Sequence, residues 1–250
     1  MRSVLTSAQD VLRRMHGIEA AVDLLLVDPR PVPRGAATQL LAALAEDNSC
    51  NAAAIERCNG VQALLDTLRR SEAGDHDTAV SVAALAALGR LAQQSNHSRN
   101  AVRLAGGVPL IIRVLADCSS RLLVAGEAAA CLGAVAIDNL ENQVSIGEEG
   151  AVQPLITAAE AASGCRRLRL RFLSALRSIS SLHPDNRMRI EEVGGRALLQ
   201  EIMQLGEPQG RRSNGRGRTS PAELLSASII GILAYETWRE LYAHLRALFA

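Results

Sequence analysis

Aromatic residues are almost absent from the 250-residue chain. Phe, Trp and Tyr together make up 2% of it, although hydrophobic residues account for 48%. The apolar content is therefore Ala, Leu, Val and Ile. Sheet cores use aromatic side chains heavily, whereas helices pack well through ridges and grooves built of Ala and Leu. The composition favours an all-α fold, and the chain is long enough to bury a sizeable core.

The chain also lacks an excess of charge, since 27 basic residues stand against 26 acidic ones. No overall field attracts it to nucleic acid or to a membrane surface. No uninterrupted apolar run is long enough to span a bilayer. We therefore expect neither a nucleic acid nor a membrane among its partners.

The five cysteines form no C-x-x-C pair: Cys50, Cys58, Cys118, Cys131 and Cys165. An odd, scattered set is typical of reduced, mostly buried thiols in an intracellular protein, and we expect a cytoplasmic one. The Arg and Ser residues near the N-terminus leave a mitochondrial presequence as an alternative. Asp10 argues against it, and the same segment fits the first repeat described below.

Catalytic and metal-binding motifs are missing as well. The sequence has no G-x-x-x-x-G-K-[ST], G-x-S-x-G or H-E-x-x-H, and its five histidines belong to no recognisable metal motif. The glycine pairs at 106–107 and 194–195 recur at one position of a repeat, so a structural role explains them. We predict no catalytic, cofactor or metal site, and no enzyme.

What the chain does contain is a repeat. Four segments align: 51–61, 98–108, 142–152 and 186–196. Each begins with Asn or Ser, has an aliphatic residue four positions later, and ends in a Gly- or Ala-containing turn. The residues after the turn, with Ile18 as the N-terminal equivalent, are spaced by 43, 47, 44 and 44 residues (Ile18, Val61, Val108, Val152, Arg196). We expect the Asn or Ser to cap a helix start, and glycine to close the turn.

A second, independent register supports the first. Leu44, Leu91, Val135 and Ile179 each precede the Asn or Ser by seven residues, within Ala- and Leu-rich segments. A short helix, a turn and two longer helices in about 40 to 47 residues is the armadillo/HEAT class of repeat. We predict a single domain 1–250 with units at about 8–50, 51–97, 98–141, 142–185 and 186–234, and a C-terminal capping helix at 235–250.

The strings Asn142…Ile146…Gly150-Ala151-Val152-Gln153-Pro154-Leu155 and Asn100-AVRLAGGVPL resemble the armadillo repeat family. The resemblance covers roughly residues 8 to 234. It implies a right-handed α-solenoid of about five repeats. It also implies a non-enzymatic protein–protein interaction scaffold or adaptor that binds its partner along the concave third-helix surface.

Importin alpha, one member of that family, binds extended basic peptides through a Trp and an Asn on each third helix. Neither residue stands at the matching positions here: Gln39, Ala86, Ala130, Ser174 and Ser228 for Trp, and Ala43, Arg90, Ala134, Ser178 and Ile232 for Asn. Nuclear-signal binding of that type is therefore not expected. The resemblance offers other partner-binding candidates: Gln39, Arg90, Arg171, Ser174 and Ser178. A wall of Ala and Ser suits a partner helix or another solenoid, although it could equally contact nothing specific.

Two segments stand apart from the repeat. The basic run 166–171 is either a patch for an acidic partner or phosphate, or a solvated helix start. Residues 206–221 add about ten residues, rich in Gly, Arg and Ser, to the last unit, and we predict a flexible loop insertion there. The loop is either passive, phosphorylated at Ser213, Thr219 or Ser220, or in contact with RNA.

Two further hypotheses for the function remain open. Armadillo-type nucleotide-exchange cofactors of heat-shock chaperones are similar in size and also have few repeats. Alternatively, the chain is a constitutive subunit of a large eukaryotic assembly, such as a ciliary or cytoskeletal complex.

Overall fold

The computed structural model describes residues 2–27, 31–75, 77–117, 121–198 and 200. Within those residues the chain forms thirteen α-helices and one short π-helix, and no strand. The all-α prediction is confirmed. The predicted loop insertion at 206–221 and the capping helix at 235–250 lie outside the described residues.

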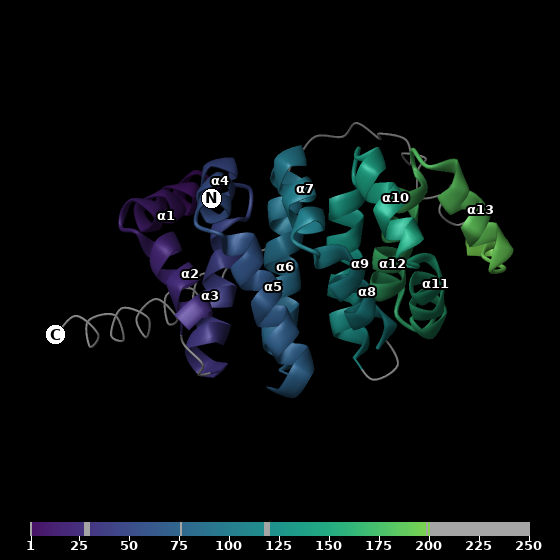
Figure 1. The fold of residues 1–250 in the computed structure, drawn as a ribbon, viewed down its shortest axis with the longest axis horizontal. Coiled ribbons are helices and arrows are strands. Elements are labelled where there is room, and N and C mark those ends of the chain that lie inside the picture. Colours follow the sequence, from purple (N-terminus) through teal and green to yellow (C-terminus); the bar gives the residue numbers. More distant parts are fainter. Residues whose placement is uncertain (1, 28–30, 76, 118–120, 199, 201–250) are drawn as a thin grey trace, which may run out of the picture.

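The helices are of three kinds, which follow one another in a fixed order along the chain (Figure 1). The first helices are α1 (Arg2–Arg14), α4 (Ser49–Arg57), α7 (Asn96–Leu104), α10 (Leu140–Glu148) and α13 (Pro184–Glu192), and all but α1 are short. The second helices are α2 (Gly17–Val27), α5 (Gly60–Arg70), α8 (Gly107–Ala116) and α11 (Val152–Ala161). The third helices are α3 (Pro31–Leu44), α6 (Thr78–Gln94), α9 (Leu122–Ala136) and α12 (Arg166–Ser180), and the π-helix η1 (Ser71–Asp75) joins α5 to α6.

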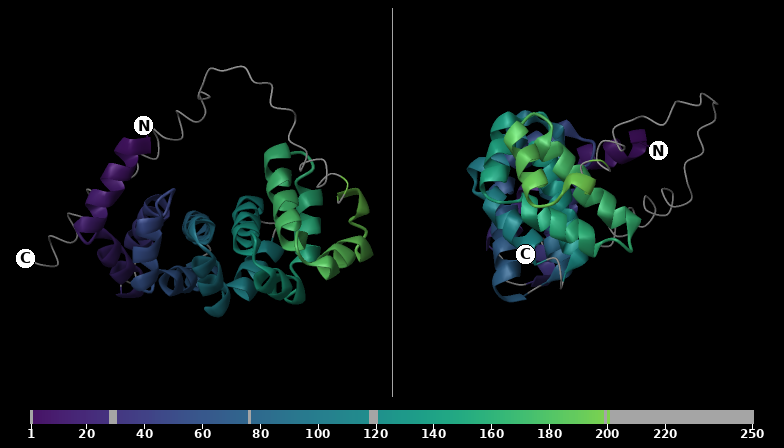
Figure 2. Two further views of the ribbon diagram at one scale, coloured as in Figure 1. Left: turned by 90° about the horizontal axis from the view of Figure 1, so that it is seen from above. Right: turned by 90° about the vertical axis from the view of Figure 1, so that its right-hand side faces the viewer.

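The described helices stack side by side into an arc, as Figure 2 shows from above. The third helices line the inside of the arc and the second helices its outside. Neighbouring third helices contact each other far more extensively than neighbouring second helices do. Closer approach on one side than on the other is what curves a stack of repeats and creates a concave surface.

The core confirms both registers found in the sequence. The aliphatic residues that carry the two registers are buried, and none is more than 1% exposed: Ile55, Val102, Ile146, Ile190, Leu44, Leu91, Val135 and Ile179. Each second helix also buries one apolar face, formed in α5 for example by Leu64, Leu65 and Leu68. One continuous core therefore runs through the stack.

The turn between first and second helices uses the same backbone conformation in every unit. His16, Asn59, Gly106, Gly150 and Gly194 all have positive φ, between 58° and 81°. In four of the five turns a glycine follows, and in the turn before α11 it is Ala151. Where glycine is present the approach is close: a Cβ on Gly107 would lie 2.7 Å from the carbonyl oxygen of Val102. The turn thus packs directly against the core aliphatic residue five positions earlier.

The helix caps lie three residues before the predicted positions. Asn48, Ser95 and Asn139 are the N-caps of α4, α7 and α10, and their side chains accept from the backbone N–H of residues 51, 98 and 142. The prediction that Asn51, Ser98 and Asn142 are caps was therefore wrong. A helix needs its cap outside the first turn, whereas these residues lie inside it.

The cysteine prediction was also partly wrong. All four described cysteines are free, but Cys50 and Cys165 are exposed and only Cys131 is fully buried. Among the helices that the structure describes, none is long and apolar enough to cross a bilayer.

Candidate partner-binding wall

Each third helix leaves one stripe of side chains uncovered by its neighbours, on the inside of the arc. We call these stripes together the concave wall. Its members recur at intervals of three or four residues along each helix, which places them on one face. They are Gln39, Ala43 and Glu46 of the first unit; Ala79, Ala86, Arg90 and Gln93 of the second; Leu123, Glu127, Ala130, Ala134 and Ile137 of the third; and Arg167, Arg171, Ser174, Ser178 and Ser181 of the fourth. Buried Ala83 fills the gap between Ala79 and Ala86, and Ala134 lies on the same face although it is only 3% exposed.

The five candidate residues from the sequence all lie on this wall. Gln39 and Ser174 are exposed, while Arg90, Arg171 and Ser178 are half-buried. The hydroxyl of Ser178 donates to the carbonyl oxygen of Ser174, 3.1 Å away, within its own helix. Their role in binding a partner stays a prediction.

Both candidate arginines are held by the preceding unit. The guanidinium of Arg90 donates to the carbonyl oxygen of Ala42 at 2.8 Å and lies 3.7 Å from the carboxylate of Glu46. Arg171 forms an ion pair with Glu127. We expected these side chains to offer their charge to a partner. Instead each one contacts the preceding unit, where a carboxylate lies beside its charge.

The wall also exposes two large apolar side chains that the sequence reasoning missed. Leu123 is 65% exposed at the start of α9, and Ile137 is 36% exposed just beyond its end. Small residues separate them, since Ala130 and Ala134 lie on the same stripe. The repeat would have placed both on the wall. Leu123 occupies the same repeat position as Ala79 and Arg167, and Ile137 the same position as Gln93 and Ser181.

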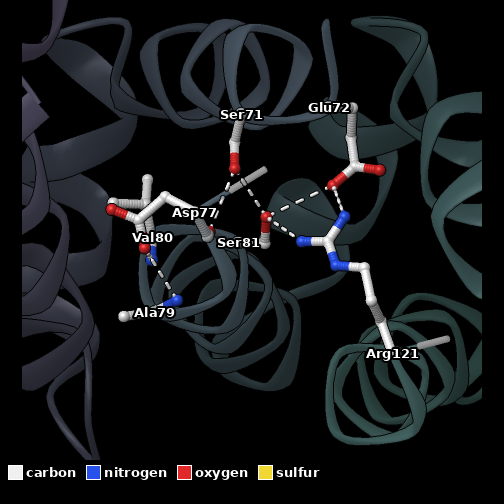
Figure 3. A network of polar contacts seen from close by, with 7 residues as sticks. All are labelled: Ser71, Glu72, Asp77, Ala79, Val80, Ser81 and Arg121. Atoms are coloured by element: carbon white, nitrogen blue, oxygen red, sulfur yellow. Dashed lines mark hydrogen bonds and ion pairs between the residues drawn. The ribbon is translucent and has the colours of Figure 1, made fainter. Parts of the chain in front are cut away.

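A polar network near one end of the third helices fixes α9 against α6 (Figure 3). Arg121, just before α9, donates to the carboxylate of Glu72 at 2.8 Å and to the hydroxyl of Ser81 at 3.0 Å. Ser81 in turn lies 2.7 Å from the hydroxyl of Ser71. The side chains of Arg121 and Glu72 are only 12% and 23% exposed, so this ion pair is well shielded from solvent. The network ties the start of α9 to η1 and α6.

Two features of the described residues bear on other kinds of site. The described part of the chain contains no group of His, Cys, Asp or Glu side chains that could hold a metal ion. The Cys131 thiol is unsuited to act as a nucleophile, because burial, and then the nearby carboxylate of Glu127, raise its pKa to about 12.

Comparisons with known proteins agree with this architecture. No protein-family profile and no curated protein matches the chain. Solved structures do match. The chain is similar to an engineered protein solved as a structural-genomics target, with 22% identity over 94% of this chain and 85% of the other, at a TM-score of 0.69. It is also similar to a designed armadillo repeat protein in complex with the peptide (KR)4, with 19% identity over 93% and 86% of the two chains, again at a TM-score of 0.69.

A third structure, described as computationally designed armadillo repeat proteins for modular peptide recognition, matches with 19% identity over 92% and 85% of the two chains, at a TM-score of 0.66. At such identities the likeness shows the fold alone. The fold is that of an armadillo repeat solenoid.

Proposed function

We propose that the chain is a non-enzymatic protein-interaction scaffold or adaptor, which binds a protein partner along its concave wall. The observation that carries the proposal is the wall itself: a surface shared by the four third helices, on which Ala and Ser recur and the side chains of Leu123 and Ile137 are exposed. Other large apolar side chains are exposed on the described residues, for example Val27 and Leu104, but Leu123 and Ile137 are the two that lie on the wall. The designed armadillo proteins of similar fold recognise peptides, which agrees with a protein partner.

The composition of the wall favours a folded partner over an extended peptide. An extended peptide needs side chains that hydrogen-bond its backbone, and the wall offers few long polar groups that are not already engaged. Alanine and serine allow a partner helix to approach closely instead. The free cysteines of the described residues favour an intracellular, cytoplasmic setting for such a scaffold.

Filling the wall tests the proposal. The partner is first isolated from the native source by affinity purification and identified by mass spectrometry, and its affinity is then measured by titration. Ala130→Trp places a bulky ring on the wall, and Ala161→Trp, an exposed position on α11, is the matched control. We expect the first variant to weaken binding at least tenfold and the second to leave it unchanged. Equal affinities for both variants would exclude the wall as the site.

Charge reversal on the wall gives a second test. We expect Arg90→Glu with Arg171→Glu to weaken partner binding by about tenfold or more, near 1.4 kcal/mol. Because Arg171 pairs with Glu127, the control exchanges both partners, Arg171→Glu with Glu127→Arg, which keeps an ion pair on the wall. If the variant with Arg90→Glu and Arg171→Glu binds normally, and changes in the 207–220 segment abolish binding, the site lies in that segment.

The identity of the captured partner separates the scaffold from the two other hypotheses. Recovery of a heat-shock chaperone, together with faster nucleotide release from it, would establish an exchange cofactor. Recovery of one stoichiometric assembly, with an isolated chain that aggregates, would establish a constitutive subunit.

A further inference from the structure

Charge is distributed unevenly along the chain. Residues 1–162 contain 13 arginines against 18 acidic residues, whereas residues 163–250 contain 14 arginines against 8 acidic residues. Every basic residue is an arginine, since the sequence has no lysine. The near-zero net charge therefore conceals an acidic N-terminal part and a basic C-terminal part.

On the wall this asymmetry is concentrated at one residue. Arg167 is exposed in the first turn of α12, and it makes no hydrogen bond or ion pair within the described residues. It differs in this from Arg90 and Arg171, which the preceding unit already engages. Arg167 is thus the wall's uncompensated cation in the part of the chain that the structure describes.

The position of Arg167 relative to the apolar groups is fixed by the repeat. It occupies the same register on α12 as Leu123 does on α9, and these two third helices pack against each other. Helices in contact lie about 8–10 Å apart, so one ligand can touch both side chains. The N-termini of α9 and α12 also lie at this end of the wall and add partial positive charge.

The two exposed apolar side chains, Leu123 and Ile137, set the length and the direction of a helix that could bind along α9. Leu123 and Ile137 stand fourteen residues apart on one stripe, which corresponds to roughly 21 Å along a helix. Small side chains lie between them on α9, and serines face them on α12. Such a surface accepts the backbone of another helix at close range, with one anchor at each end.

We propose that the partner segment is an acidic amphipathic helix of about four turns that lies lengthwise along α9 and α12. Its two apolar anchors, about fourteen residues apart, cover Leu123 and Ile137, and carboxylates in its last turn pair with Arg167. It runs antiparallel to α9, because its negative C-terminal end then meets the positive N-termini of α9 and α12. This inference rests on the proposed function and specifies the partner's chemistry.

Charge complementarity favours this partner over a nucleic acid. Binding to phosphates requires several uncompensated cations, and single-stranded bases also stack on aromatic side chains. The described wall carries one such cation and no aromatic residue. Apolar anchors as exposed as Leu123 are instead what the stripe of an amphipathic helix buries.

The test uses the full chain and a synthetic helical peptide of about eighteen residues. The peptide has two leucines fourteen positions apart, alanine and glutamine between them, and glutamates in its last turn. A second peptide carries arginines in place of the glutamates. Affinities are measured by fluorescence anisotropy at low and at physiological salt.

We expect the acidic peptide to bind more tightly than the basic one, and increasingly so at low salt. Arg167→Glu should weaken the acidic peptide about fivefold and strengthen the basic one, a reversal that misfolding cannot produce. Leu123→Ser should weaken both peptides roughly tenfold. The matched controls are Arg113→Glu on the outside of the arc and Leu104→Ser on α7, both exposed, and neither should change affinity.

Two outcomes would overturn the inference. Arg167→Glu and Arg113→Glu could have the same effect, or the basic peptide could bind as tightly as the acidic one. If Ala130→Trp still abolishes binding of the natural partner in either case, the wall remains the site and only the partner's chemistry is wrong. If Ala130→Trp has no effect on that partner, the proposed function itself fails.

Discussion

The side-chain amide of Asn142 donates a hydrogen bond to the backbone carbonyl of Val135, 2.8 Å away. This bond joins the first turn of α10 to the end of α9, where helix carbonyls have no partner within the helix. Asn51 and Asn186 repeat it, at 3.0 Å from the carbonyl of Leu44 and 2.7 Å from that of Ile179. All three asparagines are completely buried. The repeated asparagine therefore connects consecutive units.

Removing this amide should destabilise the fold. We expect Asn142→Ala to lower the free energy of unfolding by about 1–3 kcal/mol, because the buried carbonyl of Val135 loses its donor. Urea denaturation followed by circular dichroism measures the change. Gln153→Ala, at an exposed amide on α11, should change stability by no more than about 0.5 kcal/mol. A loss in Asn142→Ala as small as in this control would contradict the connecting role.

The turn between first and second helices can be tested by exchanging asparagine and glycine at its positive-φ position. Asn59 and Gly106 occupy the same turn with φ of 60° and 71°. Glycine adopts this region without a steric penalty, and asparagine adopts it with a small one. We expect Asn59→Gly to stabilise the fold and Gly106→Asn to destabilise it, each by less than about 1 kcal/mol in the free energy of unfolding. The melting temperature should rise slightly in the first variant and fall slightly in the second. Changes of the same sign in both variants would contradict this explanation.

The pair of Arg121 and Glu72 should contribute to stability as a unit. Replacing Glu72 with Gln leaves a largely buried guanidinium without its counter-charge, so we expect a loss of about 1–3 kcal/mol. Arg121→Met should cause a similar loss. The double variant should lose clearly less than the sum of the two, which a double-mutant cycle in urea measures. Strict additivity would show that the two side chains do not interact energetically.

Cys131 should make the fold sensitive to alkaline pH. Burial raises the pKa of its thiol from 9.0 to about 12. The unfolded chain therefore loses this proton first, and between these values the unfolded state binds fewer protons than the folded one. Stability is fully present below pH 9 and falls as pH rises above it, by about 1.4 kcal/mol per pH unit at most.

The absence of lysine removes the commonest side chain that titrates in this range and would obscure the effect. Urea denaturation at pH 8 and pH 10.5 should show a smaller loss in Cys131→Ala than in the unchanged chain. Exposed Cys165 provides the control, because Cys165→Ala should retain the pH dependence. A dependence unchanged in Cys131→Ala would show that this thiol ionises normally.

The periodic part of the fold could be predicted from the sequence. Two registers, one carried by Ile146 and its equivalents and the other by Val135 and its equivalents, fixed the kind of repeat and the buried positions. They could do so because each unit buries the same positions against its neighbours, and the same selection of residues therefore recurs along the chain. The resemblance drawn from those positions also placed Gln39, Arg90, Arg171, Ser174 and Ser178 on one surface.

The contacts between units were decided only by the tertiary structure. Arg90 reaches Ala42 and Arg171 reaches Glu127, 48 and 44 residues away, and nothing local to either arginine reveals that its charge is already engaged. The same holds for Asn142, whose side chain donates a hydrogen bond to the preceding helix α9 instead of capping its own helix. A repeat pattern specifies which face a residue occupies, because that depends on helical periodicity alone. Which atoms the residue contacts there depends on how the neighbouring unit packs against it. That placement is determined by packing across the whole stack.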